Sequence, residues 1–141
     1  MPTPPTLEYL FTLTATLREQ NSVIANGPQG TRVVVTVTGG TFEGPKMRGT
    51  VDNSGGDWVT LRADQNLKLD VRVILHTEDG AEIFMRYEGI GVRQDGELKL
   101  VTAPLFETGD ERYAWLNNVQ AITSGTSGGG IVTYDVYAAR P

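Results

Sequence analysis

The stretch LDVRVILHTEDG, residues 69–80, decides the fold because apolar and polar residues alternate along most of it. Odd positions from 69 to 75 hold Leu, Val, Val and Leu, whereas even positions from 70 to 76 hold Asp, Arg, Ile and His. A period of two predicts a β-strand with one buried face. The turn residues Glu78-Asp79-Gly80 then predict a tight hairpin into the returning segment AEIFMRYEGIGV.

Further β-prone segments flank this hairpin and are separated by Gly, Pro, Asn and Asp turns. They include LEYLFTLTATL (7–17), TRVVVTVTGGTF (31–42), WVTLRA (58–63), LKLVTAPLFE (98–107) and IVTYDVYAA (131–139). We count about eight to ten strands, and this spacing is typical of an all-β domain. The prediction is a single antiparallel β-barrel over residues 7–141, with a β-sandwich as the alternative and a flexible segment over residues 1–6. A barrel of about eight strands is either filled by side chains or holds one small ligand.

Composition limits the function classes. The chain of 141 residues carries a net charge of −5, which argues against nucleic acid and anionic membranes as partners. It has no cysteine, which excludes disulfides, thiolate catalysis and cysteine zinc sites, and we expect no metal and no cofactor. No basic leader and no apolar run of membrane-spanning length occurs, so we expect a cytoplasmic protein.

Three tempting motifs have simpler interpretations. The loop SGTSGGG (124–130) lacks the Lys-Ser/Thr pair and the helix of a phosphate-binding loop, so it is interpreted as a hairpin turn. No Gly-x-Ser-x-Gly elbow of a serine hydrolase is present. His76 has a side chain suited to general base catalysis, but a lone histidine at a strand end is more often a surface residue.

The polar face of residues 69–76 contains the first candidate catalytic pair. Asp70 and Arg72 are two residues apart and therefore share one face of the strand. If that face lines the barrel interior, Arg72 can hold a substrate oxyanion and keep Asp70 ionised. If it faces outward, the two side chains form a solvated pair or contact another subunit.

Further candidates lie in two other segments. Asp57 and Trp58 follow two glycines. The carboxyl could transfer a proton beside an aromatic wall. Alternatively, Trp58 could pack the end of the barrel while Asp57 caps a turn. Glu107 could form an acid–base pair with Asp57. Three side chains that alternate over 113–117 would share a ligand-facing side if the segment is extended, and would separate if it is helical. They are Tyr113, Trp115 and Asn117.

Taken in order, several segments resemble a bacterial and fungal family catalogued as the domain of unknown function three-two-three-seven. They are NGPQGTR (26–32), VTGGTFEGPKMRGTV (37–51), GGDW (55–58), LDVRVILHTEDGAEIFMRYEGI (69–90) and FETGDERYAWLN (106–117). The resemblance implies a single-domain barrel of the allene oxide cyclase-like or calycin-like kind and no established general activity. It places the family's motif on three turn glycines and ten further residues. They are Gly39, Gly40, Gly44, Asp57, Trp58, Asp70, Arg72, Asp79, Gly80, Glu107, Tyr113, Trp115 and Asn117.

Three functional hypotheses follow. The leading one is a barrel that binds a small apolar metabolite bearing a carbonyl or carboxylate, and that catalyses a cofactor-free isomerisation, cyclisation or elimination. In it, Arg72 holds an oxyanion, one of the carboxyl groups moves the proton, and aromatic residues shape the pocket. The second is a non-catalytic small-molecule carrier, and the third is a structural subunit of a homo-oligomer with a solid interior. The lining of the barrel interior separates them.

Overall fold

The computed structural model describes residues 1–141 and contains eleven strands and one 3₁₀ helix. In chain order the elements are β1 (Thr6–Leu17), β2 (Ser22–Gly27), β3 (Gly30–Glu43), β4 (Arg48–Val51), β5 (Gly56–Leu61), β6 (Leu67–Thr77), β7 (Glu82–Gln94), β8 (Glu97–Thr102), β9 (Leu105–Glu107), η1 (Glu111–Asn118), β10 (Gln120–Gly128) and β11 (Ile131–Arg140). The short helix η1 lacks the length and the apolar character needed to cross a membrane.

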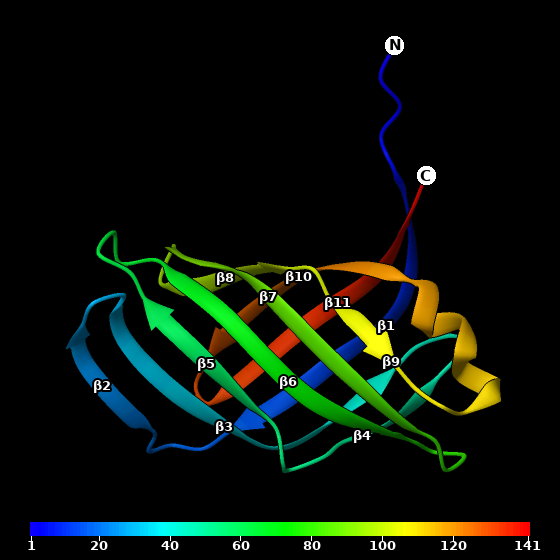
Figure 1. Cartoon of the computed structure of the whole chain (residues 1–141), viewed down its shortest axis with the longest axis horizontal. Helices are drawn as coiled ribbons and strands as arrows, with labels where there is room; N and C mark the ends of the chain where they lie inside the picture. The colour runs from blue at the N-terminus through cyan, green and yellow to red at the C-terminus, as the bar shows by residue number, and fades with distance from the viewer.

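Eight strands close into a ring, which confirms the predicted antiparallel barrel (Figure 1). Around the ring the order is β6, β5, β3, β1, β11, β10, β8 and β7, and the pairing of β7 with β6 completes it. Every pairing in the ring is antiparallel. The strands β2, β4 and β9 lie outside this ring and pair with its members.

Strand β6 shows why the sequence folds this way. Its odd-numbered residues Leu69, Val71, Val73 and Leu75 are all buried in the barrel core, whereas its even-numbered residues face outward. The hairpin that joins β6 to β7 turns at Gly80, whose φ of +94° belongs to the left-handed region that favours glycine. The alternation in residues 69–76 therefore predicted the strand, and the structure shows that its apolar face is the one that points into the barrel.

One end of the barrel is closed by aromatic side chains and by η1. The ring of Phe11 packs edge-to-face against those of Phe42 and Phe106, with centroids 5.4 and 6.1 Å apart. Leu116 of η1 is fully buried against the same core. Figure 1 shows η1 at this end of the molecule, with β2 at the opposite end.

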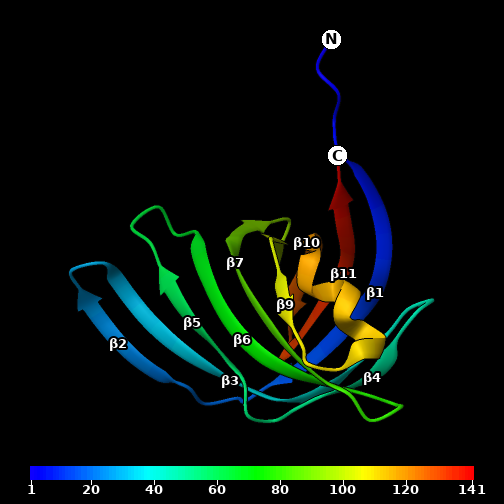
Figure 2. The same cartoon turned by 45° about the vertical axis from the view of Figure 1, so that its right-hand side comes forward.

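The opposite end of the barrel is open. Three inward-facing apolar side chains near it, Leu17, Leu67 and Leu98, are only half-buried. Beyond β1 the chain turns back as β2, which pairs with the first half of β3 and with no other strand. In Figure 2, β2, β3, β5 and β6 form one curved layer, and β2, which is not part of the ring, lies at the edge of this layer.

Candidate functional site

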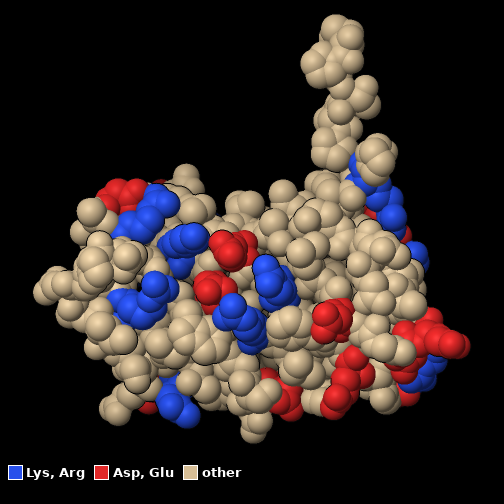
Figure 3. Space-filling model, viewed as in Figure 1, with Lys and Arg blue, Asp and Glu red and all other residues tan.

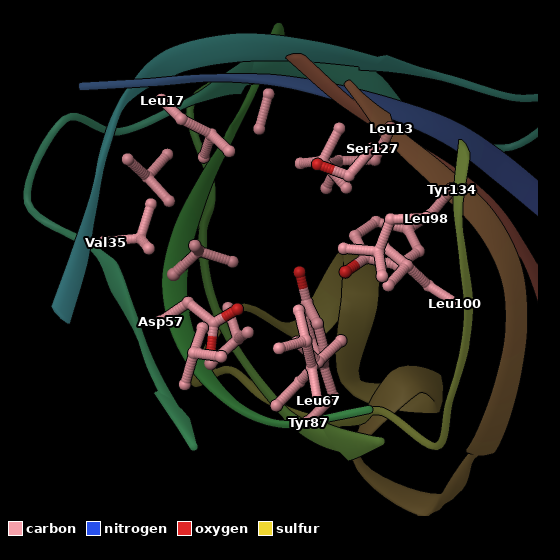
Figure 4. Close-up of a pocket in the computed structure, with 17 residues that line it drawn as sticks. Leu13, Leu17, Val35, Asp57, Leu67, Tyr87, Leu98, Leu100, Ser127 and Tyr134 are labelled. Atoms are coloured by element: carbon pink, nitrogen blue, oxygen red, sulfur yellow. The ribbon is translucent and has the colours of Figure 1, made fainter. Parts of the chain in front are cut away.

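A cavity of about 120 Å³ lies inside the barrel, between its open end and the aromatic plug. Fifteen of its 17 lining residues are hydrophobic. These fifteen include Tyr87 and Tyr134, the other two residues are Asp57 and Ser127, and no Lys, Arg or His lines the cavity. For scale, a dry protein cavity of about 150 Å³ holds one benzene molecule. The interior can therefore receive a group about as large as a single ring (Figure 4).

Asp57 supplies the only carboxyl group in this cavity. The β5–β6 ladder pairs Asp57 with Val71 and resumes at Thr60 with Lys68, so the residues between them do not pair. In this gap, the backbone N–H of Asp70 donates to Oδ1 of Asp57 at 3.0 Å. The second carboxyl oxygen makes no hydrogen bond to the protein, and Figure 4 shows the carboxyl group directed into the cavity.

Burial sets the ionisation of Asp57. It raises the pKa of the Asp57 carboxyl to about 6, because a charge is costly in an apolar cavity, and the neighbouring Asp70 charge raises it further. The hydrogen bond from the Asp70 N–H opposes this shift only in part. At neutral pH the group therefore exchanges readily between its acid and base forms, as a proton-transfer catalyst must.

Tyr87 and Tyr134 face Asp57 from other strands of the barrel. Their rings pack edge-to-face with centroids 5.3 Å apart, and their hydroxyl groups point into the cavity in Figure 4. Burial raises the pKa of both hydroxyls, so both remain protonated donors at neutral pH. Gly125 leaves room for Tyr134, since a Cβ there would lie 2.6 Å from the tyrosine Cδ1.

The structure corrects the expectation that Arg72 reaches the cavity. Asp70 and Arg72 lie on the outer face of β6, where their side chains form an ion pair of 3.7 Å. Arg72 also lies over the ring of Trp58, 5.5 Å from its centroid. Acidic and basic side chains alternate over this outer surface in Figure 3. Arg72 cannot hold an oxyanion inside the barrel, because it lies on the outer face of β6, whose inward positions from 67 to 75 carry only Leu and Val.

Two other expected site residues also lie outside the cavity. Trp58 faces outward from β5 and is 38% exposed, so it forms no wall around Asp57. Glu107 is exposed on β9, where its backbone pairs with Phe84 of β7. The expected carboxyl pair of Glu107 and Asp57 is therefore absent.

The three aromatic and amide candidates belong to the closed end. Residues 111–118 form η1, so the extended arrangement that would align them does not occur. The Tyr113 hydroxyl donates to the Asp79 carboxylate, 2.9 Å from each oxygen. Trp115 packs against the core with the Lys46 Nζ 5.3 Å from its ring centroid, and the Asn117 side chain bonds the backbone of Thr108. These contacts hold η1 on the barrel.

His76 lies on the outer surface, as its position at a strand end suggested. Its Nε2 is 3.0 Å from Oδ1 of Asp52, and its Nδ1 is 3.6 Å from Glu82. No group of three or more His, Asp or Glu side chains is arranged to hold a metal ion.

Sequence reasoning missed Tyr87 and Tyr134, although both carry a usable signal. Tyr87 has the same phase as Ile83 and Met85, and Tyr134 has the same phase as Val132 and Val136. A tyrosine in the buried phase of a barrel strand places its hydroxyl inside, where it needs a polar neighbour or a ligand. Asp57 follows the same rule, since it shares its phase with Val59.

Comparison with known proteins supports this architecture. The hydroalkoxylation enzyme phnH of Penicillium herquei is 36% identical over 121 residues, which cover 85% of this chain and 74% of that protein. A UPF0311 protein of Rhodopseudomonas palustris is 29% identical over 152 residues, covering 94% of this chain and 97% of the relative.

Solved structures have the same fold. A β-barrel-like protein of Acinetobacter baumannii superposes with a TM-score of 0.89 at 28% identity and covers 99% of both chains. An enzyme of Penicillium herquei superposes with a TM-score of 0.74 at 30% identity, over 99% of this chain and 98% of that one. The family model described as protein of unknown function (DUF3237) matches residues 5–139, and the chain therefore belongs to that family.

Proposed function

We propose that this protein is a cofactor-free enzyme that closes a ring in a small, mostly apolar substrate by adding a substrate hydroxyl across a carbon–carbon double bond. The observation that carries the proposal is Asp57, a single carboxyl with a pKa of about 6 in an apolar cavity, facing two tyrosine hydroxyls. The reaction class comes from the relative named as a hydroalkoxylation enzyme, which shares 36% of its aligned residues with this chain.

The chemistry needs only the movement of one proton. The protonated Asp57 carboxyl donates its proton to one alkene carbon, which forms a C–H bond and leaves positive charge on the other carbon. The substrate hydroxyl oxygen attacks that carbon, forms the C–O bond and releases its proton, which returns to the Asp57 carboxylate directly or through a tyrosine hydroxyl. The product is an isomer of the substrate, so the reaction consumes no oxidant or reductant. The ionised Asp57 also stabilises the intermediate cation.

The cavity lining selects a neutral substrate. A carboxylate-bearing ligand would find no Lys, Arg or His among the lining residues to balance its charge, and Asp57 would repel it. A hydroxyl or carbonyl group, by contrast, can pair with Tyr87, Tyr134 or Asp57. Within the carbonyl and carboxylate alternatives considered from the sequence, the lining therefore favours neutral oxygen-bearing metabolites.

The test uses ortho-prenylphenol, because its trisubstituted double bond gives a tertiary cation when protonated. In deuterated water, the enzyme should form the cyclic ether with one deuterium in the new C–H bond, as followed by chromatography and NMR. Asp57→Asn should lower the rate by about 10²-fold or more, since a lost general acid costs this much. The rate of the wild type should fall about tenfold per pH unit above pH 6, as Asp57 ionises.

Asp135→Asn is the matched control. Asp135 is also a half-buried aspartate that accepts one hydrogen bond, from Thr12 at 2.7 Å, but it lies on the outer face of β11. Its replacement should leave the rate unchanged. Equal loss in both variants, or full activity of Asp57→Asn, would overturn the assignment of Asp57. Binding of the phenol without turnover at any pH would instead favour the carrier hypothesis.

A further inference from the structure

We propose that the ligand of this barrel carries an apolar tail, which leaves the cavity through the open end and lies along the inner face of β2, on Val33 and Val23. This inference rests on the proposed function in one respect, namely that a small apolar ligand occupies the cavity. It adds a second binding subsite and names Val23 as a residue that determines specificity for the tail.

Strand register shows that this subsite is continuous with the cavity wall. Val23 of β2 pairs directly with Val33 of β3, and Val33 pairs directly with Val59 of β5. Directly opposed residues in antiparallel strands point to the same face of the sheet. Val59 is buried and lines the cavity, so Val33 and Val23 continue its apolar wall in one row.

Exposure increases along this row from the cavity outward. Val59 is 6% exposed, Val33 is half-buried against the core, and Val23 is 60% exposed. Two strand spacings of about 4.8 Å separate the ends of the row, so it offers an apolar track about 10 Å long. Strand β2 carries no charged residue over Ser22–Gly27. A hydrocarbon tail fits this track, whereas an ionic group would find no partner on β2.

The size of the cavity supplies a second argument. Its volume of about 120 Å³ holds a group of roughly one ring. The closed end cannot accept more, because Phe11 and Leu116 fill it. Any larger ligand whose reacting group sits at Asp57 must therefore extend through the open end, where β2 pairs with the first half of β3 (Figure 2).

Strand β2 provides its own control. Ile24 is the next residue and is 61% exposed, almost the same as Val23, but it pairs with Arg32 and therefore lies on the opposite face. Val23→Ser and Ile24→Ser remove similar apolar area from the same strand at equally exposed positions. A general effect on β2 would appear in both variants, whereas loss of the tail subsite would appear only in Val23→Ser.

The experiment measures dissociation constants of a series of para-alkylphenols, from methyl to octyl, by isothermal titration calorimetry. Wild type should bind about fourfold more tightly for each methylene that becomes buried, until the tail passes β2. Val23→Ser should bind para-methylphenol like wild type but lose several-fold of affinity for the longest members. Ile24→Ser should match wild type throughout the series.

Three outcomes would overturn the inference, and they are distinguishable. If phenols bind but affinity does not change with chain length, the tail subsite is wrong while the cavity proposal stands. If no phenol binds and ortho-prenylphenol is not converted, both proposals fail. If sedimentation shows wild type as a dimer and Val23→Ser as a monomer, a second copy of the chain covers β2 instead of a ligand.

Discussion

Both ends of the barrel are lined by inward-facing side chains, but these side chains fill the closed end and leave a cavity near the open end. At the closed end, aromatic rings on β1, β3 and β9 interlock and η1 covers them, so the space is full. At the open end, the same alternation of inward side chains leaves a cavity with Asp57 in its wall. The comparison shows that inward-facing side chains of a barrel contribute to stability where they pack against one another. Where they border an empty space, they are available to bind a ligand.

The largest expected effect concerns the closed end. Phe11→Ala removes a fully buried ring that contacts two other phenylalanines, so we expect a loss of about 3–5 kcal/mol in the free energy of unfolding. Urea denaturation measures it, with Leu98→Ala at the half-buried open end as the comparison. A Leu98→Ala cost as large as that of Phe11→Ala would show that the two ends do not differ as described.

Asp57→Asn should raise the free energy of unfolding, whereas Phe11→Ala should lower it. The Asp57 pKa is about 6 in the folded protein against 3.8 as its ordinary value, so ionisation favours the unfolded chain. This cost is absent below about pH 4, grows as pH rises toward 6 and is constant above that. Since one pKa unit corresponds to about 1.4 kcal/mol, Asp57→Asn should be more stable than wild type by up to about 3 kcal/mol at pH 8.

Denaturation of both proteins at pH 4, 6 and 8 tests this sign. The advantage of Asp57→Asn should be near zero at the lowest pH and should be complete at the highest. An advantage that stays constant with pH would mean that the gain does not come from ionisation. A wild type that gains stability relative to the variant as pH rises would contradict the raised pKa.

A smaller effect is expected from the contact that fastens η1. Tyr113→Phe removes the hydroxyl that donates to Asp79 while keeping the buried ring, so unfolding should become easier by about 1 kcal/mol. Thermal denaturation measures it. Binding of phenols in the cavity should not change, because Tyr113 does not line it. A large loss of binding would show that the closed end shapes the cavity.

The smallest effect is expected on the outer face of β6. Arg72→Ala removes an exposed ion pair with Asp70 and a contact with the Trp58 ring, which together should cost less than about 1 kcal/mol. Turnover of ortho-prenylphenol should be unchanged. A rate loss comparable to that of Asp57→Asn would show that Arg72 takes part in catalysis, and would refute the division between inner and outer faces.

Sequence reasoning could predict the barrel but only part of the site. The alternation around Val71 predicted the strand, because a period of two is a local property of the chain, but it left open which face lines the barrel interior. Asp57 was among the predicted candidates, and its position two residues before the buried Val59 explains why its side chain points inward. Tyr87 and Tyr134 were missed because the candidate residues were chosen from the polar alternate positions of β6. A polar side chain that points into the barrel instead occupies one of the alternate positions that are otherwise apolar.

The hollow itself could not be predicted. Whether inward side chains meet depends on the stagger of strands that are distant in sequence and on where small residues face the interior, as Gly125 does beneath Tyr134. The position of Glu107 relative to Asp57 was beyond reach for the same reason. The state of residues 111–118 was left open because alternation over five residues fits a strand and a helix equally well.

The gap in the β5–β6 ladder has a practical consequence. The amide of Asp70 donates to a carboxyl that titrates inside the cavity, and not to another strand. Its proton and nitrogen resonances should therefore shift with the charge on Asp57. An NMR titration of nitrogen-15-labelled protein that follows this one backbone signal would read the protonation state of the cavity carboxyl without a substrate.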